Sequence, residues 1–252
     1  MIRLIQITDL HIGQPGDNTF GVDVRMNFAE ILQEAAKLKP DALILTGDLC
    51  FDLGDQQIYK WIRQQLNMYG IPFEVIPGNH DSVELMAAAF DKMQHFKENE
   101  LYFSWQSGTE EIIFLDTSPG VVSSKQLAWL KNKLSTKKGD FILFMHHPPI
   151  LCGVPHMDSK YALKNRDDLQ EILFEYRGKI HIYCGHYHVE RTLYLHNLIV
   201  NITPSCFFQI DMNSEAFRID HYRIAFRLIE MEGSGLLRQS LHYFDGSSLP
   251  KE

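Results

Sequence analysis

Five short clusters of carboxylate, amide and imidazole side chains are the part of this sequence best suited to chemistry. They are Asp9-Leu10-His11, Gly47-Asp48, Gly78-Asn79-His80-Asp81, His146-His147-Pro148-Pro149 and Gly185-His186-Tyr187-His188. A donor set that mixes oxygen and nitrogen and contains no thiolate suits manganese, iron or zinc rather than a calcium or thiolate site. The clusters therefore predict a transition-metal site, provided that the fold brings them together.

Each cluster comes directly after a run of residues typical of a buried β-strand. The expected strands cover residues 3–8, 42–46, 73–76, 112–115, 141–145 and 180–184, and helical periodicity covers 24–38, 56–69, 84–93, 125–134 and 167–176. Apolar strands that alternate with helices predict an α/β layered fold, with helices on the sheet faces. Because the carboxyl ends of such strands share one edge, clusters far apart in sequence are expected to converge there.

Beyond about residue 190 the pattern changes to strands without intervening helices. These strands are expected over residues 192–195, 198–202, 217–230 and 236–244. They predict that the strand-rich C-terminal part, about residues 190–252, completes a second sheet. Because there is no internal repeat and no long Pro-, Gly- or Ser-rich linker, we expect residues 1–252 to form a single domain.

Taken singly, each cluster has an ordinary structural interpretation, since Asp9 could begin a turn and Asp48 could cap a helix. Together they are better explained by one site, because buried carboxylates and imidazoles at one edge are costly unless they are paired or metal-bound. In D-x-H and H-x-H the two side chains would lie on the same side of an extended chain. Gly47, Gly78 and Gly185 each precede a candidate ligand, where we expect a positive φ or the close approach of another segment.

In this order the five clusters resemble the signature of the calcineurin-like metallophosphoesterases, which reads D-x-H, GD, GNH[DE], H and GHxH. The resemblance covers about residues 1–200. The HHPP segment at residues 146–149 is similar to that of the bacterial class III cyclic nucleotide phosphodiesterases and glycerophosphodiesterases. The family resemblance implies an α/β fold of four layers, αββα, in which two mixed sheets pack together.

The resemblance also implies a centre of two divalent or mixed-valence metal ions (manganese, iron or zinc), bridged by Asp48 and by a water or hydroxide. One metal would take Asp9, His11 and His188, and the other would take Asn79, His146 and His186. We favour His146 over its neighbour His147 because His146 occupies the strand-end position that matches the family's ligand. His147 would then line the site or orient a neighbouring group.

For catalysis, the resemblance implies in-line attack of the bridging hydroxide on phosphorus. His80 matches the family's non-ligand catalytic histidine and would protonate or stabilise the leaving alkoxide. Asp81 would orient His80, with a purely structural role as an equal alternative. Phe207, Phe208 and Gln209 either line the substrate pocket or pack against the second sheet.

The composition narrows the choice of partners. A formal net charge of −8, without any run of basic residues, argues against a nucleic acid polymer as substrate. No apolar stretch approaches the roughly 18–20 residues that span a bilayer, so we expect no membrane partner and a cytoplasmic location. The four cysteines lack C-x-x-C spacing and are expected to be buried free thiols. The sequence leaves open whether the protein forms a homodimer or a larger homo-oligomer.

We therefore expect a metal-dependent phosphoric diester hydrolase acting on small phosphodiesters, either cyclic nucleotides or glycerophosphodiesters. The alternatives are a phosphomonoesterase, a nuclease or a nucleotide pyrophosphatase with the same site, or a metal-binding module without catalysis. The last alternative predicts that some metal ligands are replaced by other residue types, and none of the seven candidate metal ligands is missing. The metal ligands do not fix the leaving group, because selectivity depends on pocket shape and loops.

Overall fold

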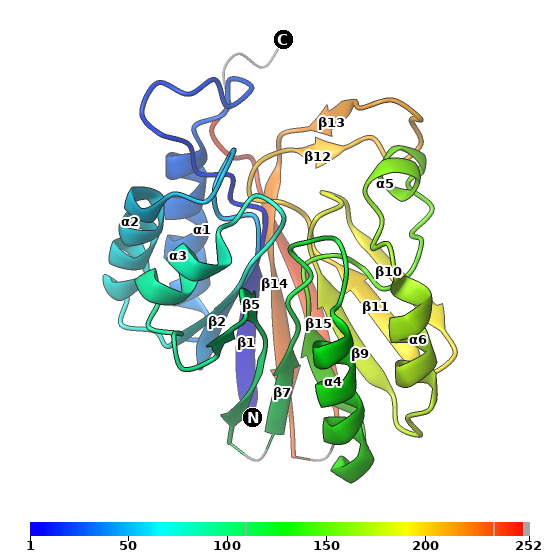
Figure 1. Ribbon diagram of the computed structural model, residues 1–252. Coiled ribbons are helices and arrows are strands. Elements are labelled where there is room, and N and C mark those ends of the chain that lie inside the picture. The colour runs from blue at the N-terminus through cyan, green and yellow to red at the C-terminus, as the bar shows by residue number, and fades with distance from the viewer. Residues whose placement is uncertain (109, 234, 249–252) are drawn as a thin grey trace.

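Two mixed β-sheets pack together at the centre of the computed structural model, which describes residues 1–108, 110–233 and 235–248 (Figure 1). The first sheet has the strand order β15 (Leu237–Phe244), β14 (Ile224–Met231), β1 (Ile2–Ile7), β2 (Ala42–Thr46) and β3 (Phe73–Ile76). The second has the order β10 (Arg191–Leu195), β11 (Leu198–Ile202), β9 (Ile180–Cys184), β8 (Phe141–Phe144), β7 (Glu110–Phe114) and β6 (Phe103–Ser107). Two short antiparallel pairs join β4 (Phe96–Lys97) to β5 (Glu100–Leu101) and β12 (Gln209–Ile210) to β13 (Ile219–His221).

Helices lie outside both sheets and complete the expected αββα arrangement. The helices α1 (Val24–Lys37), α2 (Gln56–Asn67) and α3 (Val83–Ala89) flank the first sheet, and α4 (Ser124–Thr136) and α6 (Arg166–Phe174) flank the second (Figure 1). The short helix α5 (Pro155–Lys160) lies near the carboxyl ends of the strands. The cysteines are buried and free, as expected. No helix in the described ranges is long and apolar enough to cross a membrane.

The strands after residue 190 differ from the expectation. The strands β10 and β11 extend the second sheet, but β14 and β15 belong to the first, where β14 pairs antiparallel with β1. The prediction that the C-terminal part completes the second sheet is therefore wrong for these two strands. The physical reason is that β1 is buried over its last four residues, so its second edge needs a partner for its backbone groups.

A buried arginine on β14 connects the two sheets. Arg227 is 3% exposed, and its guanidinium donates to the Ile202 carbonyl at 2.9 Å, to Thr203 Oγ1 at 2.9 Å and to Gln239 Oε1 at 3.2 Å. Thr203 in turn donates to the side chain of Gln6 on β1. No described carboxylate forms an ion pair with Arg227, and burial lowers its pKa. The charge of Arg227 is therefore compensated by neutral acceptors from both sheets.

We predict that Arg227→Met lowers the free energy of unfolding by about 3 kcal/mol, because it leaves buried acceptors without a donor. Urea denaturation of the metal-free protein measures the change. The control is Arg238→Met on β15, whose side chain is about half exposed and pairs with Glu230 and Glu232. An exposed pair of this kind is worth about 1 kcal/mol or less. Equal losses in the two variants would contradict the prediction.

Candidate metal centre

The predicted ligands meet at one edge of the molecule, where strands of both sheets end. Asp9 and His11 follow β1, Asp48 follows β2, Asn79 follows β3, His146 follows β8, and His186 and His188 follow β9. All except Asn79 are buried. This edge brings together side chains from the beginning, middle and later part of the chain, as the strand-end positions predict.

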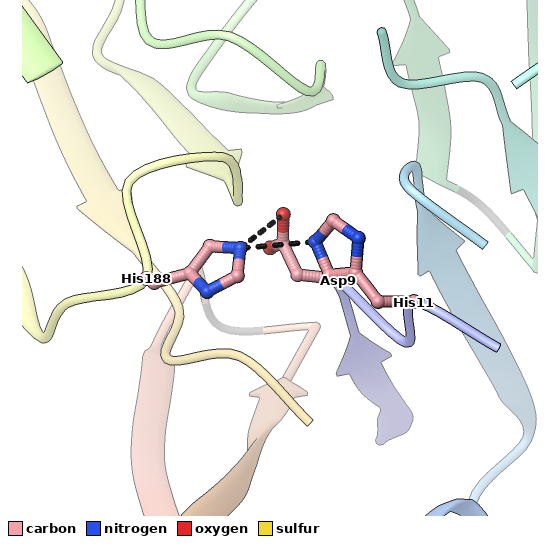
Figure 2. A group of neighbouring side chains, drawn as sticks. All are labelled: Asp9, His11 and His188. Atoms are coloured by element: carbon pink, nitrogen blue, oxygen red, sulfur yellow. Dashed lines mark hydrogen bonds and ion pairs between the residues drawn. The ribbon is translucent and has the colours of Figure 1, made fainter. Parts of the chain in front are cut away.

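One group of ligand atoms lies between β1 and β9. Figure 2 shows the imidazole of His188 facing Asp9 and His11. His188 Nε2 lies 3.1 Å from His11 Nε2 and 3.4 Å from Asp9 Oδ1. Potential donor atoms of all three residues lie within 4.8 Å of one another, so a single cation can contact each of them.

A second group gathers around Asp48. Its Oδ2 lies 3.2 Å from His146 Nε2, and donor atoms of Asp48, His146 and His186 lie within 4.8 Å of one another. The same oxygen is 3.8 Å from Nε2 of His11, which belongs to the first group. Asp48 therefore stands between the two groups, in the position of a bridging carboxylate.

Backbone carbonyls orient three of the imidazoles. Nδ1 of His146 lies 2.8 Å from the Thr46 carbonyl, and Nδ1 of His188 lies 2.9 Å from the Phe208 carbonyl. Nε2 of His186 lies 3.0 Å from the carbonyl of Tyr161. A ring nitrogen that donates to a carbonyl leaves the other nitrogen of the ring as a metal ligand.

The free nitrogen of His146 tests whether these residues suit a metal. Nε2 of His146 is buried and has no hydrogen-bond partner within the described part of the chain, while its neighbour at 3.2 Å is a carboxylate oxygen. A buried imidazole nitrogen without a partner is unfavourable unless something coordinates it. The orphaned atom, the buried carboxylates and the absence of thiolates from the two groups all fit a transition-metal cation.

The charges of the cluster favour ionised carboxylates. Burial opposes ionisation of Asp48, but the nearby imidazoles of His146, His11 and His80 together outweigh it and hold the pKa of Asp48 well below its usual value. For the same pair, burial lowers the pKa of His146, yet the attraction of Asp48 raises it to about 9. Burial lowers the pKa of His11 to about 3 and that of His186 to about 4, so both are neutral. Ionised carboxylates and neutral imidazoles are the states that bind metals, so His146 must release its proton to become a ligand.

The backbone at the ligands is not extended. Five of the seven predicted ligands have a positive φ, namely Asp9 (54°), His11 (46°), Asp48 (51°), His186 (69°) and His188 (51°). The expectation that D-x-H and H-x-H are extended is therefore wrong, since these side chains converge through left-handed turns. A left-handed conformation is uncommon outside glycine and costs about 1–3 kcal/mol at each residue. Such strain concentrates at functional sites.

The three glycines of the motifs act as expected. Gly47 has a φ of +97°, and an added Cβ would lie 2.6 Å from both Gly78 N and His146 Nδ1. A Cβ on Gly78 would overlap Asp48. A Cβ on Gly185 would overlap Thr8 and lie 2.5 Å from a carboxylate oxygen of Asp9. Each of these glycines allows two strand ends to approach one another.

His80 and Asp81 have different surroundings. His80 is partly exposed, its ring lies edge-on to His11 at 5.0 Å, and its Nδ1 is 3.0 Å from the carbonyl of Asp52. The carboxylate of Asp81 accepts hydrogen bonds from Gly78 N at 2.9 Å, from Leu49 N at 3.2 Å and from the hydroxyl of Tyr59 at 2.9 Å. These contacts join the loops after β2 and β3, and none of them involves the ring of His80.

His147 lies beside the cluster. Its Nδ1 is 3.0 Å from Thr117 Oγ1, and its ring lies 4.1 Å from that of His186. His146, unlike His147, shares a group of ligand atoms with Asp48 and His186. The geometry therefore favours His146 of the two as a ligand.

A cavity of about 500 Å³ opens over the cluster. It is lined by His11, Phe20, Asp48, Phe51, Asn79, His80, His156, Met157, Lys160, Tyr161, His186, His188, Phe207, Phe208, Ile210, Ala216 and Phe217. Phe207 and Phe208 thus line the pocket, whereas Gln209 donates to the carbonyls of Ser205 and Arg223. Among these lining residues, Lys160 is the one lysine or arginine.

Sequence reasoning missed several residues that line the cavity. They are Phe20, Phe51, His156, Met157, Lys160, Tyr161, Ile210, Ala216 and Phe217. They come from the loop after β1, the loop after β2, helix α5 and its flank, and the β12–β13 pair. Apart from Phe217, which begins the strand expected over residues 217–230, the one available signal was the number of apolar residues in segments expected to be loops.

Comparison with known proteins identifies the family. The model of the calcineurin-like phosphoesterases matches residues 2–190. The chain belongs to this family. It is 36% identical over 230 residues to a probable cyclic nucleotide phosphodiesterase of Fibrobacter succinogenes, covering 91% of this chain and 90% of the relative. It is 33% identical to a probable glycerophosphodiester phosphodiesterase of Arcobacter nitrofigilis, covering 84% and 82%.

A solved structure of similar fold is that of a dimetal phosphatase from Danio rerio. It matches this calcineurin-like phosphoesterase with a TM-score of 0.69 and 11% identity, and the match covers 98% of this chain and 99% of the other. At this identity the likeness concerns the fold alone. It agrees with the αββα arrangement described above.

We predict that Gly185→Ala lowers the free energy of unfolding by about 1–3 kcal/mol, because the new methyl group displaces Thr8 and Asp9. Urea denaturation of the metal-free protein measures this loss. Gly233→Ala is the matched control, since its Cβ would have no atom within 4 Å and its φ is not left-handed. The control is expected to change stability by about 0.5 kcal/mol or less. A neutral Gly185→Ala would show that the two strand ends do not pack as described.

Proposed function

We propose that this calcineurin-like phosphoesterase hydrolyses small phosphodiesters, either cyclic nucleotides or glycerophosphodiesters, at the candidate metal centre. The observation that carries the proposal is the pair of neighbouring ligand groups at the cavity, one of which contains Asp48, whose Oδ2 also lies 3.8 Å from His11 of the other. The named activities of the relatives from Fibrobacter and Arcobacter support it. So does a third relative, a 3′,5′-cyclic-nucleotide phosphodiesterase of Nostoc, which is 28% identical over 93% of this chain.

The proposed ligand set for two metal ions is the one expected from the sequence. Asp9, His11 and His188 would hold one ion, and Asn79, His146 and His186 would hold the other, with Asp48 between them. The two groups of donor atoms support the first triad and two members of the second. Asn79 lines the cavity beside them and is exposed, so it has room to turn toward an ion. Manganese, iron and zinc suit this donor set.

Two ions in this centre would polarise the phosphoryl oxygens and activate water for in-line attack on phosphorus. The chain's own residues supply the remaining functions. Asp48 is oriented by the backbone N–H of His80, which donates to its Oδ1 at 2.9 Å. The ring of His80 lies at the cavity, where it can donate a proton to the leaving oxygen. Lys160 lines the same cavity and can offer a positive charge to the phosphate.

For Asp81 we propose a positioning role in place of direct contact with His80. Its carboxylate is partly buried and accepts hydrogen bonds from backbone N–H groups of the two loops that carry Asp48 and Asn79. Burial raises the pKa of Asp81 to about 6, and the nearby Asp48 carboxylate adds to this effect. The hydrogen bonds to Asp81 therefore fix the separation of the two loops, and with it the distance between Asp48 and His80.

A substrate panel tests the proposed function. The manganese-loaded protein is assayed with 2′,3′-cyclic AMP, 3′,5′-cyclic AMP, glycerophosphoethanolamine, bis-p-nitrophenyl phosphate and p-nitrophenyl phosphate, with and without a chelator. We expect the diesters to be hydrolysed faster than the monoester and the activity to disappear with the chelator, because the water must be activated by metal. A faster reaction with the monoester, or no hydrolysis of any diester, would contradict the proposal.

The choice between His146 and His147 as the metal ligand gives a further prediction. His146→Ala is expected to retain about one manganese ion per chain, since it removes a donor from the group around Asp48. His147→Ala should retain about two, because His147 contacts Thr117 and His186 from outside the group. Metal analysis after reconstitution and dialysis measures both. The reverse pattern would exchange the roles of the two histidines.

The role of His80 gives a prediction that separates metal binding from the hydrolysis step. His80→Ala should keep both metal ions but slow the turnover of cyclic AMP by about 10²- to 10⁴-fold, because a basic alkoxide must be protonated as it leaves. Bis-p-nitrophenyl phosphate, which releases a weakly basic nitrophenolate, should be affected much less. Steady-state rates with the two substrates measure the difference. Unchanged rates with both would remove His80 from the mechanism.

A further inference from the structure

Five phenylalanines from separate segments form one cluster above the metal centre. The phenylalanine cluster consists of Phe20, Phe51, Phe207, Phe208 and Phe217. The ring of Phe20 lies between 5.5 and 6.4 Å from each of the other four. Phe207 lies 5.2 Å from the ring of His11, and Phe208 lies 5.2 Å from that of His188. The aromatic surface is therefore continuous with the candidate ligands.

The cluster is buried at its base and open at its outer side. Phe207 and Phe208 are 2% and 5% exposed, whereas Phe20 and Phe217 are both 46% exposed. All members of the cluster line the cavity of about 500 Å³. Figure 1 shows the loop after β1 and the β12–β13 pair, which flank the two exposed rings, at the same end of the molecule. Two large aromatic rings thus present apolar surface to the space above the metal centre.

The backbone conformation at Phe20 is also unfavourable, so stability of the fold does not account for an exposed phenylalanine at this position. Residues 19–22 form a turn in which Val22 N donates to the Thr19 carbonyl at 2.9 Å. Both central residues have a positive φ, 52° at Phe20 and 73° at Gly21. Turns with two such residues favour asparagine, aspartate or glycine at the first central position. A phenylalanine there combines a strained backbone with an exposed apolar side chain.

The charges around the cavity indicate what kind of group the cluster accepts. Of the residues that line it, Lys160 is cationic and Asp48 is the one carboxylate, and Asp48 belongs to the metal centre. A trimethylammonium group would need a free carboxylate or electron-rich rings without a competing cation. A glycerol group is small and polar and would leave the aromatic surface unused. A flat, uncharged aromatic ring fits the lining best, because such rings stack on aromatic side chains.

We propose that Phe20 and Phe217 form the binding site for an uncharged aromatic ring carried by the phosphodiester, so that this site selects nucleoside diesters over glycerol diesters. The inference rests on the proposed function and specifies which part of the cavity decides between its two substrate classes. The turn at Phe20 places its ring beside that of Phe217, with the ring centroids 6.1 Å apart, so the two exposed rings form one surface. Phe207 and Phe208 form the wall toward the metal centre.

The test compares Phe20→Gly and Phe217→Ala with the wild-type protein, each loaded with manganese. The ratio of kcat/KM for 3′,5′-cyclic AMP to that for glycerophosphoethanolamine is the main measurement. We expect this ratio to fall by on the order of 10-fold in each variant, as loss of one stacking face predicts. Calorimetric titration should show a similar loss in affinity for 5′-AMP and little loss for glycerol 3-phosphate.

Lys39→Gly is the matched control. Lys39 also has a positive φ, 50°, but it follows helix α1 and does not line the cavity. Lys39→Gly is expected to keep or raise the melting temperature, because glycine removes the strain of the left-handed backbone. In Phe20→Gly the same gain is offset by the lost contacts with the other four rings, so its melting temperature is expected to change little or fall. Only Phe20→Gly should change the substrate ratio. This separates a specificity role from a general effect on folding.

The outcomes distinguish the two proposals. If the wild-type protein hydrolyses neither diester, the proposed function fails. If it hydrolyses both and the ratio is unchanged in Phe20→Gly and Phe217→Ala, the aromatic site is overturned while the proposed function stands. Glycerophosphocholine is tested in parallel. If its kcat/KM falls more than that of cyclic AMP in these variants, the cluster is assigned to a trimethylammonium group, and the inference is also overturned.

Discussion

The buried carboxylate of Asp48 is the constraint on which the rest of the structure depends. It is 2% exposed and lies where the two sheets meet, so its negative charge must be compensated by the protein or by bound cations. The first sheet contributes Asp48 itself, and the second contributes His146, whose Nε2 approaches to 3.2 Å. Gly78 approaches so closely that no side chain fits between its loop and Asp48. When the two sheets pack together, they therefore also bring the residues of the candidate metal centre together.

Hydrogen bonds elsewhere in the fold compensate for the strained backbone of this arrangement. Left-handed backbone at five of the predicted ligands is unfavourable, and it persists because neighbouring segments satisfy the turns. The backbone N–H of Asp9, for example, donates to the Gly47 carbonyl at 3.1 Å, and the N–H of His11 donates to the Asp48 carbonyl at 3.0 Å. Arg227 and Gln6 then connect the sheets behind the site through hydrogen bonds. Without such contacts, the strained turns would relax and the ligand atoms would separate.

The sequence predicted the metal centre better than the cavity above it, for a physical reason. Candidate ligands such as Asp48 and His186 follow strands that are recognisable from local pattern, and the bounds of β2, β3 and β9 agree with expectation. Phe20 and Phe217 lie in loops, whose conformations depend on contacts that no local pattern records. The sheet to which β14 and β15 belong was likewise predicted wrongly, since pairing between distant strands depends on tertiary contacts. A cytoplasmic location and a homo-oligomer stay predictions from the sequence.

The pairing of β1 with β14 has a consequence for synthesis on the ribosome. Ile2 lies opposite Met231 and Gln6 opposite Arg227, so β1 pairs with a strand that is synthesised much later. Every predicted ligand up to His188 has been translated before β14 emerges. Until then, one edge of an apolar strand has no partner and can pair with other nascent chains. Folding of the first sheet is thus coupled to the synthesis of β14, and such long-range pairing makes it slow.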